Sequence, residues 1–275
     1  MNEISYDFSL ASFLLEVVIY LPLIFVNHKL MKNVYRRNFT CCDSSECFRC
    51  LLKNKQISKE DVNTMDKNQF VQKNGQILVP NLVLTDQPFI DNKYFEDDVK
   101  LLEGNWKVLL QECLQIIPST DKISNKTWKN NNTPDGCWSV FHLYNQGKQV
   151  ENNVKACPKT NEIINKLNSI SYSKFGNVCF SIIKPNTIIP EHCGPTNARI
   201  RCHLGLKIPP PSSNCTITVG GTKRYWKEGK CLLFDDSLPH FVNYSAEFGE
   251  QRIVFMVDFW HYKLDKNICE NLEQF

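Results

Sequence analysis

The sequence of 275 residues has little excess of either charge, since 32 Lys and Arg residues stand against 29 Asp and Glu residues, a formal net charge of +3. Proteins that bind a phosphate backbone usually carry a clear basic excess, so the composition gives no support to a nucleic-acid partner. Glycine and proline are few, at 11 and 13 residues, which excludes collagen-like and low-complexity classes. With 42% hydrophobic residues, the chain has instead enough apolar material for one substantial core.

Cysteine is below the density of a disulfide scaffold, and its count of 13 is odd, so at least one thiol is unpaired or pairs with another chain. Cys41, Cys42, Cys47 and Cys50 cluster in CCDSSECFRC. The spacing of Cys47 and Cys50 suits a metal, but no second Cys or His pair follows at the distance of a zinc finger. Disulfides or lipidated thiols are therefore favoured over zinc.

The apolar run FSLASFLLEVVIYLPLIFV covers residues 8–26 and is interrupted by Glu16 and Pro22. At about 1.5 Å per helical residue, this run nearly crosses a hydrocarbon core of about 30 Å, which favours a single transmembrane helix within residues 1–27. A cleaved signal peptide or a buried hairpin is the alternative, but no small-residue cleavage site ends the run. We therefore expect an anchor in the lipid bilayer.

The side of the membrane stays open. Lys29, Lys32, Arg36 and Arg37 follow the apolar run and by the positive-inside rule hold the remaining chain in the cytosol. Sequons for N-glycosylation instead suit the lumen of the endoplasmic reticulum or another secretory membrane. These sequons begin at Asn38, Asn125, Asn131, Asn214 and Asn243.

Residues 28–95 are polar with little periodicity and are interpreted as a stalk or linker that holds the Cys cluster. From Asp97 to Ile117 apolar residues recur at helical spacing until Pro118, which predicts an amphipathic helix at the start of a globular domain over residues 96–275. A second, short helix is expected near Thr160 to Leu167.

Beyond Trp138 the hydrophobic period changes to two. In RIRCHLGLKI (199–208) the even-numbered residues, Ile200 to Ile208, form an apolar row and the odd-numbered ones a polar row, which predicts a half-buried strand. FGNVCFSII, CTITV, GKCLLF and RIVFMVDF are further strand candidates, Gly220-Gly221 is a hairpin signal and PPPSS a loop. So many short strands predict a sandwich or a jelly roll closed around a cavity.

Three residues carry the chemistry. His192 in PEHCGPTN and His240 in FDDSLPH each follow a strand candidate, so both imidazoles can project from rim loops into one barrel mouth and chelate a metal. Arg252 begins a very apolar strand, an expensive place for a guanidinium unless an anion pairs with it. A dicarboxylic co-substrate would supply that anion, and non-haem Fe(II) oxygenases bind iron through two His and usually one carboxylate, with open positions for a 2-oxo acid and O2.

The sequence motifs around these residues are specific. HCGPTNARIRCHLGL, WKEGKCLLFDDSLPH and RIVFMVDFWH closely resemble the aspartyl/asparaginyl beta-hydroxylase family, and the resemblance runs from about Trp138 to His261. CDSSECFRC and ACPKT resemble in particular the membrane-anchored aspartate beta-hydroxylase domain-containing proteins. The resemblance implies a mainly β, cupin-like jelly roll (a double-stranded β-helix) with flanking helices, behind the N-terminal transmembrane helix.

The resemblance also implies the activity and its residues. We expect an Fe(II)- and 2-oxoglutarate-dependent dioxygenase that uses O2 to hydroxylate Asp or Asn side chains in a protein substrate. Fe(II) would be held by His192 and His240, which with Arg252 form the catalytic set. The co-substrate 2-oxoglutarate would be contacted by Trp138, Ser181, Arg201, His203 and Arg252.

Several points stay open. Gly194 stands where a carboxylate ligand is usual, which weakens the physical case for iron but matches the two-histidine pattern of the resembled family. Asp235 and Asp236 either orient iron-bound water or a histidine without touching the metal, or form a strand-end turn with solvated carboxylates. His261 is interpreted as structural. The chain lacks the long helical-repeat region of some family members, so a membrane-anchored binding or scaffold protein is the alternative. A cupin-like enzyme with another metal and no 2-oxo acid is a third hypothesis.

Overall fold

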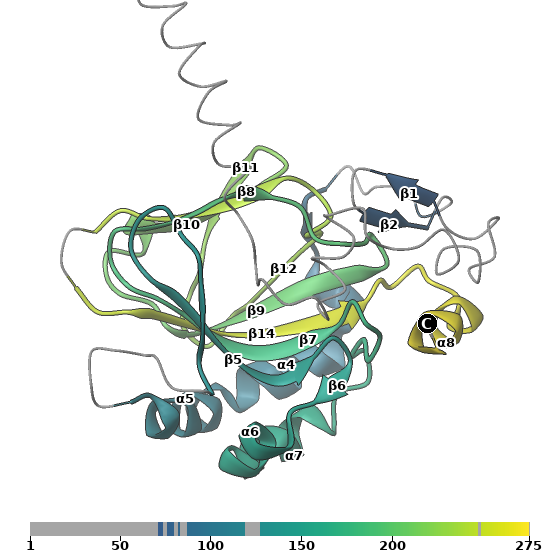
Figure 1. The fold of residues 1–275 in the computed structure, drawn as a ribbon, viewed down its shortest axis with the longest axis horizontal. Coiled ribbons are helices and arrows are strands. Elements are labelled where there is room, and N and C mark those ends of the chain that lie inside the picture. The colour runs from purple at the N-terminus through teal and green to yellow at the C-terminus, as the bar shows by residue number, and fades with distance from the viewer. Residues whose placement is uncertain are drawn as a thin grey trace, which may run out of the picture. The chain divides into compact units, whose positions relative to one another are not determined.

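The computed structural model describes residues 71–73, 76–79, 82, 87–118, 127–246 and 249–274 (Figure 1). All of them belong to the second of the two compact units into which the chain divides, Thr40–Phe275. The expected anchor at residues 8–26 and the cysteine cluster at residues 41–50 lie outside the described residues. Within the described part, none of the helices has the length and apolar character that crossing a membrane requires.

Two antiparallel sheets form the body of the domain. The larger sheet has the strand order β3-β12-β9-β14-β7-β5-β4, with β6 paired to β5, and the smaller has the order β11-β10-β13-β8. The larger sheet comprises β3 (Phe89–Ile90), β4 (Lys129–Asn131), β5 (Trp138–Asn145), β6 (Lys148–Gln149), β7 (Asn177–Ile183), β9 (Arg199–Lys207), β12 (Cys231–Phe234) and β14 (Arg252–Trp260). The smaller comprises β8 (Thr187–His192), β10 (Cys215–Val219), β11 (Thr222–Tyr225) and β13 (His240–Tyr244).

The connectivity identifies the fold. From β7 to β14 the chain passes back and forth between the two sheets, so that β7, β9, β12 and β14 lie in the larger and β8, β10, β11 and β13 in the smaller. Figure 1 shows the smaller sheet on one side of the larger one and helices on its other side. This alternation is the double-stranded β-helix, and the predicted jelly roll is confirmed.

Helices cover the other face of the larger sheet. They are α4 (Glu96–Gly104), α5 (Trp106–Ile116), α6 (Glu151–Ala156) and α7 (Pro158–Ile164); η1 (Asn92–Phe95), η2 (Ser212–Asn214) and α8 (Lys266–Gln274) lie elsewhere, and β1 (Val71–Lys73) pairs with β2 (Gln76–Leu78). α7 confirms the predicted short helix and begins with Pro158, which suits a first helical position because its missing N–H has no partner there. The preceding α6 was not predicted.

The single helix predicted from Asp97 to Ile117 is wrong in one respect, because it is broken at Asn105. The amide of the Asn105 side chain donates to the carbonyl of Leu101 at 2.8 Å and its backbone N–H donates to Leu102 at 3.2 Å. Glycine and asparagine are weak helix formers, and an Asn side chain competes for backbone carbonyls. The Gly104-Asn105 pair therefore ends α4 and lets α5 start in a new direction.

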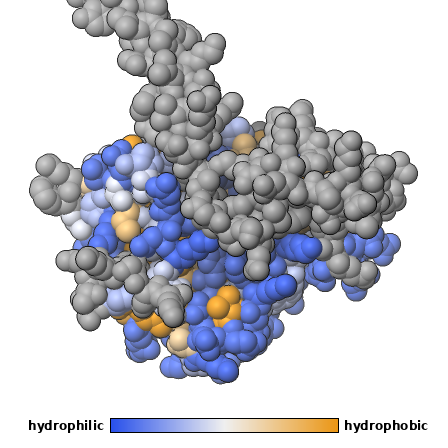
Figure 2. All heavy atoms as spheres, in the orientation of Figure 1, coloured by the Kyte–Doolittle hydropathy of each residue, from blue (hydrophilic) through white to orange (hydrophobic). Residues whose placement is uncertain are grey.

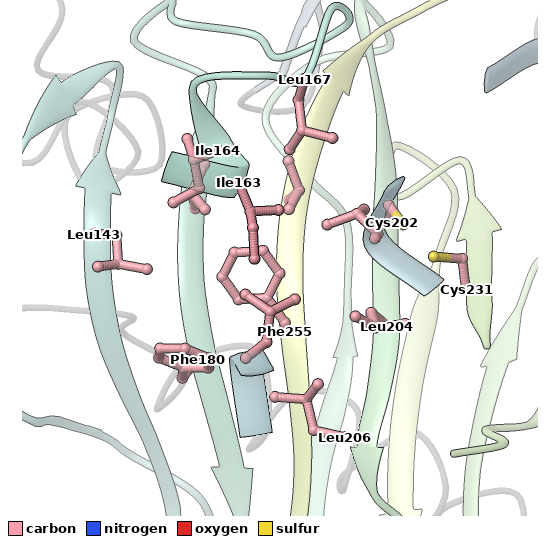
Figure 3. Packing of buried hydrophobic residues seen from close by; sticks show 14 of the residues in the cluster. Leu143, Ile163, Ile164, Leu167, Phe180, Cys202, Leu204, Leu206, Cys231 and Phe255 are labelled. Carbon is pink, nitrogen blue, oxygen red and sulfur yellow. The ribbon is translucent and has the colours of Figure 1, made fainter. Parts of the chain in front are cut away.

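The main core lies between these helices and the larger sheet. The apolar row of β9 packs there with residues of β7 and β14, and the rings of Phe180 and Phe255 are 5.2 Å apart (Figure 3). Cys202 and Cys231 are buried in the same cluster. Figure 2 shows that the described surface on the viewed face is mostly hydrophilic, with only small apolar patches.

Two buried carboxylates attach helices to their neighbours. Glu112 of α5 accepts from the backbone N–H of Lys159 at 3.0 Å and of Thr160 at 2.7 Å, at the start of α7. Asp98 of α4 accepts from the backbone N–H groups of Asn168 and Ser169. Each carboxylate satisfies N–H groups that lack a partner in their own segment.

The polar row of β9 is buried as well, which corrects the expected half-buried strand. Arg199 is fully buried, and Arg201 and His203 are each 8% exposed. The alternation was predicted correctly, but the polar face of the strand is buried as fully as the apolar one. Charged side chains in such a place need partners, and those partners define the candidate site.

Candidate active site

His192 and His240 lie directly opposite each other at the ends of two neighbouring strands, β8 and β13. Their ring centroids are 4.2 Å apart with an interplanar angle of 53°. Between this pair and the pair of Ile189 with Val242, β8 has two residues where β13 has one, a β-bulge that includes Pro190. Proline cannot donate to a ladder, so the bulge is expected there, and it re-aims the next side chain. The histidines therefore stand on strand ends, not on the rim loops that the sequence predicted.

Both imidazoles are held in the same way. Nδ1 of His192 lies 2.7 Å from the carbonyl of Pro190, and Nδ1 of His240 lies 2.8 Å from that of Leu238. A carbonyl only accepts, so each Nδ1 donates and the lone pair of each ring is on Nε2. Burial, and then the neighbouring His240, lowers the pKa of His192 to about 3, and burial also lowers the pKa of His240. Both rings are therefore neutral near pH 7, the form that binds metals.

Behind the histidines, two arginines and two aspartates form a buried ionic cluster, which we call the Arg–Asp square. Arg199 pairs with Asp236 and, at 3.0 Å, with Asp258; Arg201 pairs with Asp236 at 3.1 Å and with Asp258 at 2.8 Å. Two positive and two negative groups cancel, which is what makes their burial tolerable. Burial raises the pKa of Asp236, but the two guanidinium groups outweigh it and hold the pKa below its usual range.

Asp236 also fills the space beside Gly194. The backbone N–H of Gly194 donates to the carbonyl of Asp236 at 2.6 Å. A Cβ added at Gly194 would lie 2.6 Å from Cγ and 2.8 Å from Oδ1 of Asp236, and closer still to Oδ2. The position where a third, carboxylate ligand is usual is thus blocked by a carboxylate that is itself bound to two arginines.

The solvated turn considered for Asp235 and Asp236 is wrong, because both carboxylates are buried. Asp235 accepts from the backbone N–H and the hydroxyl of Ser237 at 2.9 and 2.6 Å. Burial raises the pKa of Asp235 to about 6, although these two hydrogen bonds oppose the shift. The turn before His240 is therefore internally braced.

Arg252 stands at the first position of β14, only 1% exposed. Its guanidinium lies 4.8 Å from the ring centroid of Trp226. Within the described part of the chain, its Nε and Nη1 atoms have no hydrogen-bond partner. Burial lowers the pKa of Arg252, with the Cys215 thiol beside it as an opposing contact. A cation buried with donors to spare is suited to an anionic ligand.

His203 connects this arginine with the histidine pair through a series of rings. The imidazole of His203 lies 6.0 Å from Trp226 and 5.0 Å from Phe234, and Phe234 lies 5.8 Å from His240. Neither nitrogen of His203 has a hydrogen-bond partner among the described residues. Burial, followed by the charge of Arg252, lowers the pKa of His203, so its neutral ring can donate one hydrogen bond.

Trp138 and Ser181 lie on the same face of the larger sheet as Arg252. Trp138 and Arg252 both pair with Ile183, and Ser181 is two residues from Ile183, so the side chains at these positions point to the same side of the sheet. The indole N–H of Trp138 donates to the hydroxyl of Ser181 at 3.2 Å. The structure thus brings Trp138, Ser181 and Arg252 to one face of the larger sheet, whereas His192 and His240 stand on strands of the smaller sheet.

Comparison with known proteins decides the family. Residues 103–262 match the family described as aspartyl/asparaginyl beta-hydroxylase. The chain belongs to the aspartyl/asparaginyl beta-hydroxylase family. The resemblance found in the sequence is thereby confirmed.

The curated relatives that match this chain are longer than the part they share with it. Aspartate beta-hydroxylase domain-containing protein 2 of Homo sapiens is 42% identical over 207 residues, which are 74% of this chain and 54% of that protein. Aspartyl/asparaginyl beta-hydroxylase of Mus musculus is 39% identical over 174 residues, 60% of this chain and 22% of that protein. The chain spans about half the length of the first curated relatives it matches.

A likeness to solved structures is weaker. A prolyl-4-hydroxylase from Pseudomonas putida aligns with 58% of this chain and 87% of its own at 12% identity and a TM-score of 0.34. A similarity this low carries no argument about activity.

Three residues that contact the candidate site were not predicted: Arg199, Trp226 and Asp258. The signal for Arg199 was its place on the polar row of β9, and the signal for Asp258 was a lone acid in the apolar RIVFMVDFW. Trp226 lies between strands and gave no periodic signal. Arg201, predicted to contact 2-oxoglutarate, uses Nε and Nη2 on Asp258 and Nη1 on Asp236, so it is anchored in the Arg–Asp square and its co-substrate role stays a prediction.

Proposed function

We propose that this beta-hydroxylase family member is an Fe(II)- and 2-oxoglutarate-dependent dioxygenase that hydroxylates Asp or Asn side chains in a protein. One observation carries the proposal: two neutral imidazoles, whose ring centroids are 4.2 Å apart, stand near a buried guanidinium whose Nε and Nη1 lack hydrogen-bond partners among the described residues. The rings of Phe234, His203 and Trp226 lie between the two groups. A metal site and an anion site side by side are what a 2-oxo acid oxygenase needs.

The residues present fit the metal. Among the described residues no group of three or more His, Cys, Asp and Glu side chains is arranged to hold an ion, so the histidine pair is the ligand set on offer. His192 and His240 would bind Fe(II) through Nε2, with further positions open to 2-oxoglutarate and O2. Bound Fe(II) supplies the redox chemistry that couples O2 and 2-oxoglutarate to hydroxylation of a C–H bond, with succinate and CO2 as the other products.

The chain itself supplies binding and orientation. Arg252, with the hydroxyl of Ser181, would hold the far carboxylate of 2-oxoglutarate by charge-assisted hydrogen bonds. His203, kept neutral by burial and by Arg252, would donate to the same dianion without adding charge. Asp236, fixed by two arginines, would orient water at the metal position while remaining ionised. The burial of these groups strengthens each of these interactions.

The test measures co-substrate binding and turnover together. Purified chain with Fe(II) should bind 2-oxoglutarate and form succinate, slowly without substrate and faster with Asp- or Asn-containing peptides. Arg252→Ala and His203→Ala should abolish 2-oxoglutarate binding, while Arg224→Ala, which alters an exposed arginine stacked on Phe89, should leave it unchanged. An absence of both binding and succinate in the wild type would overturn the proposal. Metal binding without any 2-oxoglutarate binding would favour a cupin-like enzyme of another type.

We also propose that the chain is anchored in a secretory membrane through residues 8–26. The length and the apolar character of this run support the proposal. Expression of the full chain in animal cells tests this. Resistance to carbonate extraction is the expected result, and a mobility shift on glycosidase treatment would place the domain on the lumenal side. Extraction without detergent would contradict the anchor, and an anchored chain without a shift would place the domain in the cytosol.

A further inference from the structure

A segment far upstream of the histidines contacts both of the turns that carry them. β2 runs beside the turn after His192: the backbone N–H of Ile77 donates to the carbonyl of Pro195 at 2.8 Å, and Ile77 forms an isolated parallel bridge with Thr196. Asn197 then accepts from the N–H of Val79 at 2.8 Å. Residues 76–79 thus pack on the domain, although they fall in the stretch interpreted as a linker.

Gln76 makes the decisive contact. Its side-chain amide donates to the carbonyl of Gly194 at 2.7 Å and to the carbonyl of Ser237 at 3.0 Å. Gly194 is two residues after His192, and Ser237 is three residues before His240. One NH2 group therefore uses both of its hydrogens to join the two turns from which the imidazoles project.

The backbone N–H of Gly194, which donates to the carbonyl of Asp236 at 2.6 Å, also joins these two turns. A chelate of two ligands is sensitive to their separation, since a metal–nitrogen bond of about 2.0–2.2 Å leaves little freedom in the spacing of the two rings. Groups that orient ligands without touching the metal commonly alter its affinity 10- to 100-fold.

We propose that Gln76 is a positioning residue that sets the spacing of the metal-binding histidines by clamping the Gly194 and Ser237 turns together. The inference rests on the proposed function in that it takes His192 and His240 as the metal ligands. The clamp comes from residues 76–79, far upstream of the histidines, so the geometry of the site depends on how that short segment packs on the domain.

Two substitutions separate the clamp from other effects. Gln76→Met keeps the length of the side chain but removes both donors. Gln76→Glu also removes them and adds a negative charge, which by electrostatics alone would favour a divalent cation. The clamp predicts that both variants bind Mn(II) about 10- to 100-fold more weakly than the wild type in equilibrium titrations of the full chain.

Ile77→Ala is the matched control. Ile77 is 2% exposed and packs with Phe175 and Leu272, so this variant weakens docking of the segment but leaves the amide of residue 76 in place. It should lower the thermal unfolding midpoint of the metal-free chain while changing Mn(II) affinity less than either Gln76 variant. Gln76→Met should lower the Mn(II) affinity strongly and the thermal unfolding midpoint only slightly, because Gln76 is only half-buried.

A second readout needs no metal. Hydrogen exchange, followed by mass spectrometry on peptides that cover residues 190–198 and 235–241, should be faster in Gln76→Met than in the wild type. Without the amide of Gln76, the two turns can separate more easily, and the hydrogen bond from the Gly194 N–H to the Asp236 carbonyl opens more often. Equal exchange and equal Mn(II) affinity in the wild type and Gln76→Met would overturn the clamp. A wild type that binds no Mn(II), with exchange accelerated in the variant, would instead overturn the metal site while keeping the clamp.

Discussion

Replacing Gly194 by alanine is expected to destabilise the fold, because the added methyl group overlaps the carboxylate of Asp236. The Cβ would stand 2.6 Å from Cγ and 2.8 Å from Oδ1, well inside normal contact distance. The carboxylate cannot retreat cheaply, since it is fully buried and paired with Arg199 and Arg201. Overpacking of this kind costs about 1–3 kcal/mol.

The assay is thermal and urea unfolding of the metal-free chain. For a domain of this size about 1 kcal/mol corresponds to about 2–4 °C in the unfolding midpoint, so a loss of several degrees is expected. Gly104→Ala is the control: a Cβ there has nothing within 4 Å, and alanine in a helix is better by about 0.5–1 kcal/mol. It should leave the midpoint unchanged or raise it.

A double-mutant cycle isolates the overlap. Asp236→Ala alone should cost about 3–5 kcal/mol because it leaves two buried arginines short of a partner. In that background Gly194→Ala should cost almost nothing, which gives a coupling energy of about 1–3 kcal/mol. Gly194→Asp, which restores the usual carboxylate in sequence, should not raise Mn(II) affinity, because a second carboxylate meets the first. A wild-type midpoint in Gly194→Ala, or tighter Mn(II) binding in Gly194→Asp, would refute the reasoning.

Three further outcomes follow from buried polar groups. Arg252→Met should leave the urea midpoint unchanged or raise it, because it removes a buried cation with unsatisfied donors, yet it should weaken 2-oxoglutarate binding at least about 100-fold, as measured by calorimetry. Glu112→Ala should lower the free energy of unfolding in urea by about 2–3 kcal/mol, because the backbone N–H groups of Lys159 and Thr160 lose their acceptor. Burial lowers the pKa of His261 to about 4, so this side chain takes up a proton at a lower pH in the folded state than in the unfolded state. Stability should therefore fall by up to about 3 kcal/mol as the pH drops from about 6.5 to about 4, and His261→Gln should flatten that part of the profile.

Each of these has a plain contrary result. A strongly destabilised Arg252→Met would mean that the guanidinium has partners that outweigh its burial. An unchanged urea midpoint in Glu112→Ala would mean that water replaces the carboxylate at no cost. A pH profile unaltered by His261→Gln would assign the acid loss of stability to other groups.

The sequence predicts local periodicity well in this domain and long-range pairing poorly. The alternation in β9 separates Leu204 in the core from Arg201 and His203 on the cavity side, as its pattern requires. The same pattern does not say that the polar face is covered, since that depends on β10 and β13, which reach it from later in the chain. The expected half-buried strand was therefore wrong, because the burial of its polar face depends on strands elsewhere in the sequence.

The site shows the same limit. His192, His240 and Arg252 could be singled out because their residue types are unusual in their surroundings. The partners of Arg199 could not, because Asp236 and Asp258 lie 37 and 59 positions away and meet it only when the sheet forms. β8 was missed because Pro190 and Glu191 interrupt its apolar pattern, and that interruption is the bulge that aims His192.

The pairing of His192 with His240 across β8 and β13 has a consequence for the stability and turnover of the protein. A cation held by both side chains would staple two neighbouring strands and fix their alignment, since a shift by one residue turns a side chain to the opposite face. The unfolded chain offers no such pair, so each tenfold excess of cation over its dissociation constant adds about 1.4 kcal/mol to folding. Scarcity of the metal would then leave more of the chain open to proteolysis, and the amount of protein would follow the supply of its ion.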